Sequence, residues 1–258
     1  MFIIDTHAHY DDKAFDEDRD VLLESMRNQG IGIVVNIGSS MESTRQTLAL
    51  TKQYDFVYGA AGVHPSDTKE LEDAALYEEL KEIAKEEKIV AIGEIGLDYY
   101  WDEPEREIQK RHFERQMELA RELRKPVVIH SREAAADTLN MMRLLHGEEI
   151  GGIIHCFSYG KEMAREYLNM GYYLGIGGVV TFQNAKKLKE VVEYMPLERL
   201  VLETDSPYLS PVPFRGKRNS SLNLPYVVEK IAEIKKISKE QVIEASFKNA
   251  CEVYKIVV

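Results

Sequence analysis

The stretch Phe2-Ile3-Ile4-Asp5-Thr6-His7-Ala8-His9 sets the pattern on which we expect the whole fold to rest. Its short apolar run predicts a β-strand, and two histidines follow where that strand ends. Side chains two residues apart point to the same face of a strand, so His7 and His9 are expected to aim their imidazoles at one point. Imidazole is the commonest metal ligand in proteins, and a shared divalent ion would explain this convergence.

Seven further apolar or β-branched runs recur along the 258 residues. We therefore predict eight strands, at Phe2–Asp5, Ile31–Ile37, Phe56–Gly62, Ile89–Glu94, Pro126–His130, Gly152–His155, Tyr172–Gly177 and Arg199–Thr204. Several are almost continuously apolar, which is typical of parallel strands buried on both faces. Segments with helical spacing lie between them. Ser238 and Gln241 predict a capping box at the start of the last helix.

Eight strands alternating with helices in a chain of about 250 residues predict a closed (β/α)8 TIM barrel. We expect a single domain over residues 1–258, because no linker, internal repeat or low-complexity tract interrupts the pattern. An open doubly wound sheet is the alternative. It is disfavoured because no glycine-rich dinucleotide fingerprint follows the first strand.

The composition excludes several classes of protein. Hydrophobic residues make up 44% of the chain, but no apolar run approaches the length of about 18 residues that a transmembrane helix requires. The only cysteines, Cys156 and Cys251, do not indicate a disulfide framework, and we expect a cytoplasmic location. The net charge of −11 argues against broad binding of nucleic acid. It is compatible with a local phosphate site, because bound metal ions carry positive charge. No membrane association or obligate protein partner is indicated.

Polar side chains gather where the predicted strands end, and these ends carry the catalytic groups of barrel enzymes. Six metal-competent side chains occupy the ends of five different strands: His7, His9, Glu94, His130, His155 and Asp205. Structural needs alone rarely produce such a set. His64 lies just past the third strand, whereas His112 and His146 fall in helical stretches and are expected at the surface.

Six ligands are too many for one tetrahedral zinc ion, so we predict two divalent ions. Neighbouring strands of a barrel contribute to the same ion. We assign His7, His9 and Asp205 to one ion and His130 and His155 to the other, with Glu94 bridging them. Paired ions about 3.5–4 Å apart polarise a phosphoryl oxygen and deprotonate a water. Four histidines suit Zn²⁺ or Mn²⁺, and the carboxylates also permit Mg²⁺.

The sequence resembles the TatD-type metal-dependent DNase family of the amidohydrolase superfamily almost from end to end. The resemblance rests on six motifs: DTHAHYDD (5–12), GVHP (62–65), GEIGLDYY (93–100), VIHSREA (128–134), IHCFS (154–158) and LETDSPYL (202–209). The metal positions match the assignment above. The loop RGKRN (215–219) also resembles the family, which usually continues with an acidic residue and proline. This chain has Ser220 and Ser221 there instead, so the details of substrate binding at that loop are open.

The resemblance implies a phosphodiesterase that acts on DNA, trimming single strands from the 3′ end. Other functions stay open on the same two-ion site. One is a small-molecule amidohydrolase or lactonase, although Glu94 stands where many of those enzymes use a carbamylated lysine. Another is the removal of groups from aminoacylated tRNA. A non-catalytic metal-binding protein is a further possibility, which a candidate base, Asp205, argues against.

Two residues are candidates for proton transfer and hydrogen bonding to the substrate. We expect Asp205 to hold the attacking water and to act as its general base. His64, in a turn stiffened by Pro65, is a candidate to donate a hydrogen bond to the phosphate or to protonate the leaving oxygen. Glu203 lies two residues before Asp205 and either orients a ligand or pairs with a basic residue. Cys156 is expected to turn away from His155, into the core.

Substrate contacts are expected from basic and aromatic side chains near the strand ends. Arg132 follows His130, and Arg215, Lys217 and Arg218 form the densest basic cluster of the chain. Arginine matches the geometry of phosphate in a bidentate way. Trp101 follows the strand that carries Glu94 and is a candidate to stack on an unpaired base.

Overall fold

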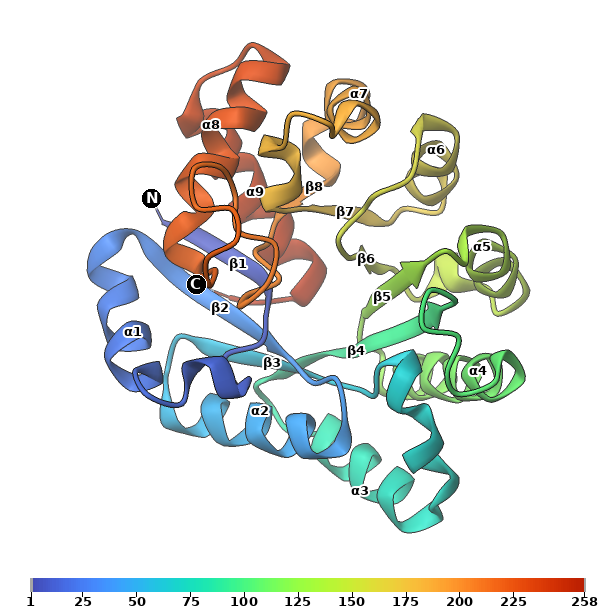
Figure 1. Ribbon diagram of the computed structural model, residues 1–258. Coiled ribbons are helices and arrows are strands. Elements are labelled where there is room, and N and C mark those ends of the chain that lie inside the picture. The colour runs from blue at the N-terminus through green and yellow to red at the C-terminus, as the bar shows by residue number, and fades with distance from the viewer. Residues whose placement is uncertain (1, 258) are drawn as a thin grey trace.

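Eight parallel strands lie side by side in chain order in the computed structural model, which describes residues 2–257. The strands are β1 (Ile3–Ala8), β2 (Ile31–Ile37), β3 (Val57–Ala61), β4 (Ile89–Asp98), β5 (Val127–Arg132), β6 (Gly152–Ile154), β7 (Tyr173–Ile176) and β8 (Leu200–Leu202). Each pairs with the next along the chain, and together they surround a common centre (Figure 1). The predicted barrel is confirmed. The doubly wound alternative is wrong, because its strand order would reverse at a switch point.

Helices follow the strands and form the outer layer of the barrel (Figure 1). They are α1 (Arg19–Met26), α2 (Met41–Gln53), α3 (Ala74–Ala84), α4 (Arg106–Leu123), α5 (Ala135–Leu144), α6 (Lys161–Asn169), α7 (Lys186–Tyr194), α8 (Leu224–Lys235) and α9 (Lys239–Tyr254). The spacing of Phe113, Met117 and Ala120 in α4 places all three in the core. The capping box between Ser238 and Gln241 is present at the start of α9. Within residues 2–257 no helix combines the length and the apolar character needed to span a membrane.

The interior of the barrel is apolar at the end away from the predicted ligands. Each strand contributes at least one side chain to a single buried cluster, and Val253 and Tyr254 of α9 pack against it. The hydroxyl of Tyr254 donates a hydrogen bond of 2.8 Å to the carbonyl of Thr6. A second and larger cluster fills the space between strands and helices. Helix α9 therefore covers this end of the barrel, and the polar side chains lie toward the other.

Strand β4 runs four residues beyond its predicted end at Glu94. Gly96 and Asp98 continue the pairing with His130 and Arg132 of β5. A Cβ atom on Gly96 would lie 1.9 Å from the carbonyl oxygen of His130, and the φ angle of Gly96 is +145°. Only glycine allows so close an approach of the two strands. The strand therefore carries Asp98, as well as Glu94, to the same end of the barrel.

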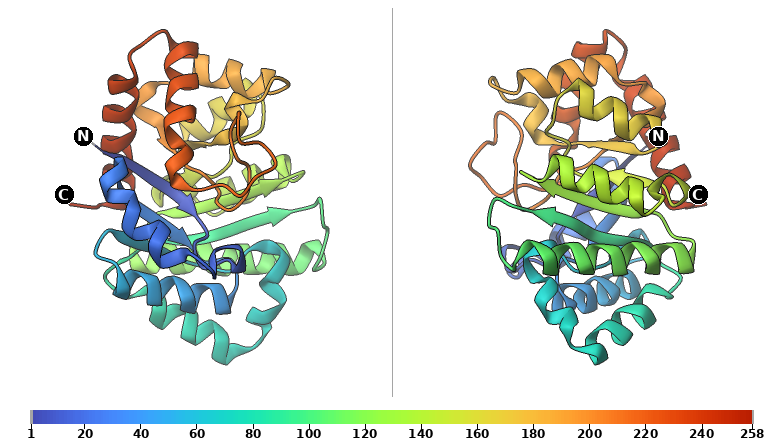
Figure 2. Two further views of the ribbon diagram at one scale, coloured as in Figure 1. Left: turned by 60° about the vertical axis from the view of Figure 1, so that its left-hand side comes forward. Right: turned by 90° about the vertical axis from the view of Figure 1, so that its right-hand side faces the viewer.

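The barrel closes between β1 and β8 by a polar seam in place of a regular ladder. Among residues 2–257, one isolated bridge pairs Ala8 with Ser206, and the backbone N–H groups of His9 and Asp205 donate to the carbonyls of Ser206 and His7. The carboxylate of Asp5 also links the two sides. Asp5 accepts hydrogen bonds from the hydroxyls of Thr204 and Ser221, both at 2.6 Å. Burial raises the pKa of Asp5 to about 7. The first strand therefore lies beside C-terminal segments of the chain (Figure 2).

Candidate metal centre

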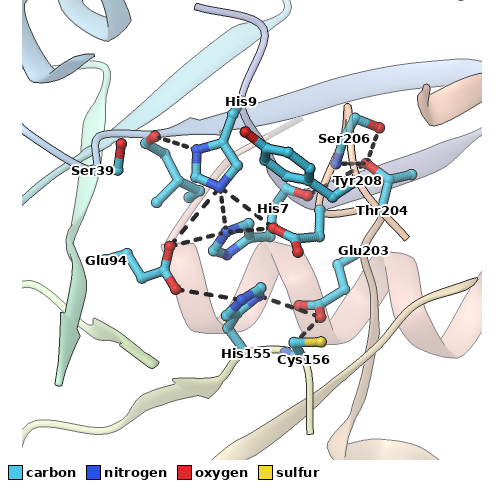
Figure 3. Close-up of polar contacts among 12 residues, drawn as sticks. His7, His9, Ser39, Glu94, His155, Cys156, Glu203, Thr204, Ser206 and Tyr208 are labelled. Atoms are coloured by element: carbon cyan, nitrogen blue, oxygen red, sulfur yellow. Dashed lines mark hydrogen bonds and ion pairs between the residues drawn. The ribbon is translucent and has the colours of Figure 1, made fainter. Parts of the chain in front are cut away.

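All six predicted ligands meet at the carboxyl ends of the strands. His7 lies in β1, Glu94 in β4 and His130 in β5. His9, His155 and Asp205 follow β1, β6 and β8 directly or within a few residues. Figure 3 shows the side chains of His7, His9, Glu94 and His155 pointing toward one another.

The first ligand set consists of His7, His9, Asp205 and one oxygen of Glu94. The Nε2 atoms of His7 and His9 lie 3.1 Å apart. Asp205 Oδ1 lies 3.6 and 3.4 Å from these nitrogens, and Glu94 Oε2 lies 3.6 and 3.9 Å from them. Donor atoms about 2.1 Å from one cation lie roughly 3.0–3.4 Å from each other in octahedral or tetrahedral geometry. The spacing of this set therefore fits a divalent ion.

The second ligand set uses the other oxygen of Glu94. Oε1 lies 2.6 Å from His130 Nδ1 and 3.4 Å from His155 Nε2. Glu94 thus offers one oxygen to each set, which is the arrangement that a bridging carboxylate requires. The positive charges of His155 and His130 outweigh the effect of burial and hold the pKa of Glu94 well below its ordinary value. Glu94 is therefore ionised and available as a ligand at neutral pH.

Hydrogen bonds behind the imidazoles select the tautomers that a metal needs. His9 Nδ1 donates to the carbonyl of Ile37 at 2.9 Å, and His130 Nε2 lies 3.0 Å from Asp98 Oδ2. With a proton on each of these nitrogens, a neutral ring directs the lone pair of its other nitrogen into the centre. The rings of His7 and His155 stack at 3.6 Å with an angle of 16° between their planes.

Asp98 is the site residue that sequence reasoning missed. It belongs to the motif GEIGLDYY and lies four residues after Glu94, on the same face of the strand. The available signal was this spacing, but the predicted strand ended at Glu94. The hydrogen bond from His130 keeps the pKa of Asp98 low despite its burial.

Glu203 lies behind His155, with its Oε1 atom 3.4 Å from His155 Nδ1. The same oxygen accepts a hydrogen bond of 2.6 Å from the backbone N–H of Cys156. A side chain at Gly175 would collide with Glu203 Oε2, so the absence of a Cβ there makes room for the carboxylate. These contacts favour the orienting interpretation of Glu203 over pairing with a basic residue.

Protonation of the histidines depends on the carboxylates around them. Burial opposes the charged form of His155, but Glu94 and Glu203 outweigh burial and raise its pKa to about 10. Asp205 likewise raises the pKa of His9 to about 9 against the effect of burial. In the metal-free protein, protons therefore occupy nitrogens that a cation would otherwise bind. Asp205 itself has a lowered pKa, because its hydrogen bond to His9 and the charge of His155 outweigh burial.

His64 lies beside the second set, and its ring centroid is 4.3 Å from that of His130. Its Nδ1 accepts a hydrogen bond of 3.1 Å from the backbone N–H of Ser66. Burial, together with the charge of His130, lowers the pKa of His64 to about 3. The ring is therefore neutral and carries its proton on Nε2, which makes it a hydrogen-bond donor.

The predicted substrate residues lie in three different environments. The guanidinium of Arg132 lies 3.8 Å above the ring of Tyr100, next to Trp101, whose side chain is 64% exposed. Arg215 lies 4.4 Å from the ring of Phe182, and Lys217 lies 6.0 Å from that of Phe214.

Arg218 has a structural partner. It forms an ion pair of 2.6 Å with Asp18 and donates a hydrogen bond to the carbonyl of Ala14. A phosphate would have to compete with this pair. In the same loop Ser221 donates the seam hydrogen bond to Asp5.

Two expectations about side-chain placement were wrong. Cys156 does not turn into the core, because its φ angle of +45° breaks the strand alternation after His155. Its sulfur lies close to His155 and Asp205 at the edge of the centre. His112 is fully buried and contacts Glu72, since the buried face of α4 includes it. His146 is exposed, as expected.

Known proteins are similar to this chain in sequence and in fold over nearly its full length. Residues 4–255 match the model of the family described as TatD related DNase. The uncharacterized metal-dependent hydrolase YabD of Bacillus subtilis is 41% identical over 256 residues, which cover 98% of this chain and 99% of YabD. YcfH of Escherichia coli K12, described in the same words, is 35% identical over 259 residues, 99% of this chain and 97% of YcfH. The crystal structure of YjjV, a TatD homolog from Escherichia coli, has a TM-score of 0.91 at 29% identity and covers 99% of this chain and 98% of its own.

Proposed function

The chain belongs to the TatD-related DNase family of metal-dependent hydrolases, and we propose that it is a deoxyribonuclease that removes nucleotides from the 3′ end of single-stranded DNA. The observation that carries this proposal is the division of Glu94 between two ligand sets. Such a division would allow two divalent ions to bind side by side, which supports displacement at a phosphodiester. The cytoplasmic location and the absence of an obligate protein partner belong to the same proposal.

The residues of the centre have separate roles in the proposed reaction. The two ions, when bound, polarise the phosphoryl group and lower the pKa of the attacking water. Asp205 is ionised and its side chain is 18% exposed, so its carboxylate accepts the proton of that water as general base. Glu94 fixes the spacing of the two ligand sets. The four histidines provide the other ligand atoms of the two sets and are fixed in position by the ends of the strands.

His64 donates its Nε2–H to a phosphoryl oxygen in the proposed reaction. A pKa of about 3 leaves this ring without the second proton that general acid catalysis would need at neutral pH. Of the two roles expected from the sequence, we therefore favour hydrogen bonding to the phosphate over protonation of the leaving oxygen. Such a donor stabilises charge that develops in the transition state.

A nuclease assay on single-stranded DNA labelled at either end tests the proposal. The protein is stripped with EDTA and reloaded with Mg²⁺, Mn²⁺ or Zn²⁺. We expect metal-dependent release of mononucleotides from the 3′ end. Asp205→Asn should lower kcat by roughly 10²–10⁴-fold while much of the metal stays bound. Asp55→Asn, an exposed carboxylate paired with Arg27, is the matched control and should retain full activity.

The same preparations separate the other candidate functions. Hydrolysis of a lactone or of aminoacylated tRNA, with DNA left intact, would replace the nuclease proposal. Metal binding without any hydrolysis would point to a storage protein. Full activity after complete removal of metal would contradict the mechanism.

A further inference from the structure

The loop that follows β4 carries two large aromatic rings into solvent beside the metal centre. Trp101 is 64% exposed and Tyr100 is 50% exposed. The two rings meet edge to face with their centroids 5.0 Å apart. Aromatic rings that only pack a loop are normally buried by it, whereas at least half of the surface of each of these two residues is exposed. These rings therefore present surface that the fold itself does not use.

Backbone hydrogen bonds hold this loop, so its conformation does not depend on the rings. Asp98 Oδ1 accepts from the N–H groups of Tyr100 and Trp101, at 2.9 and 3.2 Å. The N–H of Tyr99 donates to the carbonyl of Arg132 at 2.9 Å. The other oxygen of Asp98 holds His130. One carboxylate thus fixes the position of the aromatic loop relative to the second ligand set.

The positively charged side chain of Arg132 completes this surface. The guanidinium of Arg132 lies 3.8 Å above the Tyr100 ring, whereas that of Arg218 is engaged by Asp18. Arg132 therefore covers one face of Tyr100 while its charge stays at the rim of the centre. An arginine beside exposed aromatic rings matches the two parts of a nucleotide, since guanidinium groups bind phosphate and aromatic rings stack on bases.

We propose that Trp101, Tyr100 and Arg132 form a docking surface for one unpaired nucleotide of a single-stranded nucleic acid, with its base stacked on Trp101 and its phosphate at Arg132. This inference rests on the proposed nuclease function and adds the place where the strand is held. Because Asp98 joins this surface to His130, the docked nucleotide lies at a fixed distance from the ligand sets. Duplex DNA has no unstacked base to offer and does not fit the surface.

Trp101 is the single tryptophan of the chain, so tryptophan fluorescence, excited at wavelengths that the 14 tyrosines scarcely absorb, reports on this surface alone. The probe is a phosphorothioate single strand of about 10 nucleotides, which resists hydrolysis and spans a typical single-strand site. We expect saturable quenching of Trp101 in the metal-loaded protein. Neither a duplex of the same sequence nor inorganic polyphosphate, which lacks bases, should produce it.

Affinity is measured in parallel from the anisotropy of the same strand carrying a dye. Trp101→Ala should weaken binding roughly 5- to 150-fold, the range that loss of one stacked base produces. Arg132→Ala should also weaken binding of the strand. The matched control is Tyr194→Ala, which removes an aromatic ring that is 48% exposed at the end of α7 and should bind like the unmodified protein.

The outcomes separate this inference from the proposed function. Binding by anisotropy with unchanged Trp101 fluorescence, or equal affinity of Trp101→Ala, overturns the docking surface and leaves the nuclease proposal standing. Equal quenching by polyphosphate shows an electrostatic site without stacking and also overturns it. Failure of any single strand to bind overturns both proposals.

Discussion

The two ligand sets of the metal centre differ in what stands behind their imidazoles. In the first set, His9 donates to the neutral carbonyl of Ile37, and His7 Nδ1 has no hydrogen-bond partner among residues 2–257. In the second set, His130 Nε2 hydrogen-bonds to the carboxylate of Asp98. His155 Nδ1 also lacks a hydrogen-bond partner among residues 2–257, but it lies 3.4 Å from the carboxylate of Glu203. Carboxylates behind a histidine raise its basicity and fix its ring. We therefore predict that the second set would hold a cation more firmly than the first.

We therefore propose that the second set mainly binds metal, whereas the first set also takes part in the reaction. In this proposal the first set includes its own carboxylate, Asp205, which is the candidate to accept a proton. Beside Glu94, which both sets share, the second set has the carboxylates of Asp98 and Glu203 behind its histidines, where they would strengthen metal binding. Glu94 connects the two arrangements.

The largest effect is expected from Glu94→Gln, which removes the residue common to both sets. An amide has one weak oxygen donor and cannot bridge two cations as a carboxylate does. We expect both ions to be lost and turnover to fall by roughly 10³-fold or more. Elemental analysis after gel filtration, alongside the nuclease assay, measures both. Two ions per chain with unchanged turnover would show that the sets do not share this ligand.

Asp98→Asn tests whether the two ligand sets bind metal independently. The variant removes the charge behind His130 only, so we expect one of two binding steps to weaken by about 10–100-fold. The other step should stay unchanged, since the partner behind His9 is a backbone carbonyl. Calorimetric titration of the stripped protein with Mn²⁺ or Zn²⁺ resolves the two steps. Equal weakening of both would contradict an independent second set.

Dependence on pH follows from the raised pKa values of His9 and His155, about 9 and about 10. Each ion must displace a proton from one of these rings. The affinity of each set should therefore rise by about tenfold per pH unit between pH 7 and 9. Titrations in buffers of different ionisation enthalpy count the protons released. An affinity independent of pH in this range would mean that both rings are already neutral.

The stability of the metal-free protein should respond to pH in the opposite direction. A histidine whose pKa is raised in the folded state contributes stability that is complete below the unfolded value of 6.5 and is lost as the pH rises through the folded value. The stripped protein should therefore lose stability between pH 7 and 10. Bound metal should remove this loss, because the protons are then already displaced.

The smallest effect is expected at the seam. Ser221→Ala removes one of the donors to the buried carboxylate of Asp5 and should lower the free energy of unfolding by about 1–3 kcal/mol. Metal affinity should not change, because Ser221 contacts neither set. Urea denaturation measures the loss, with the neighbouring Ser220→Ala as control. A large fall in metal affinity with little loss of stability would place Ser221 in the centre.

Much of this architecture was accessible from the sequence. Strand β2 has the predicted bounds, and the six ligands meet because parallel strands bring their carboxyl ends to one edge. Their roles as ligands stay a prediction until an ion is measured. What escaped prediction depends on backbone details. Gly96 lets β4 run on to Asp98, and a positive φ angle turns Cys156 toward the centre.

The seam was not predictable for a different reason. Asp5 and Ser221 lie 216 residues apart in the sequence, and no periodicity relates them. Only closure of the barrel brings them together. The contact between His112 and Glu72 likewise joins two segments that lie 40 residues apart in the sequence.

The position of the seam has a consequence for protein synthesis. The first ligand set takes His7 and His9 from the start of the chain and Asp205 from beyond the last strand. A nascent polypeptide that has not yet emerged past β8 offers only part of this set. We therefore expect the proposed first ion to bind only after residues through Asp205 have joined the barrel, so chains that stop before β8 would lack the complete ligand set.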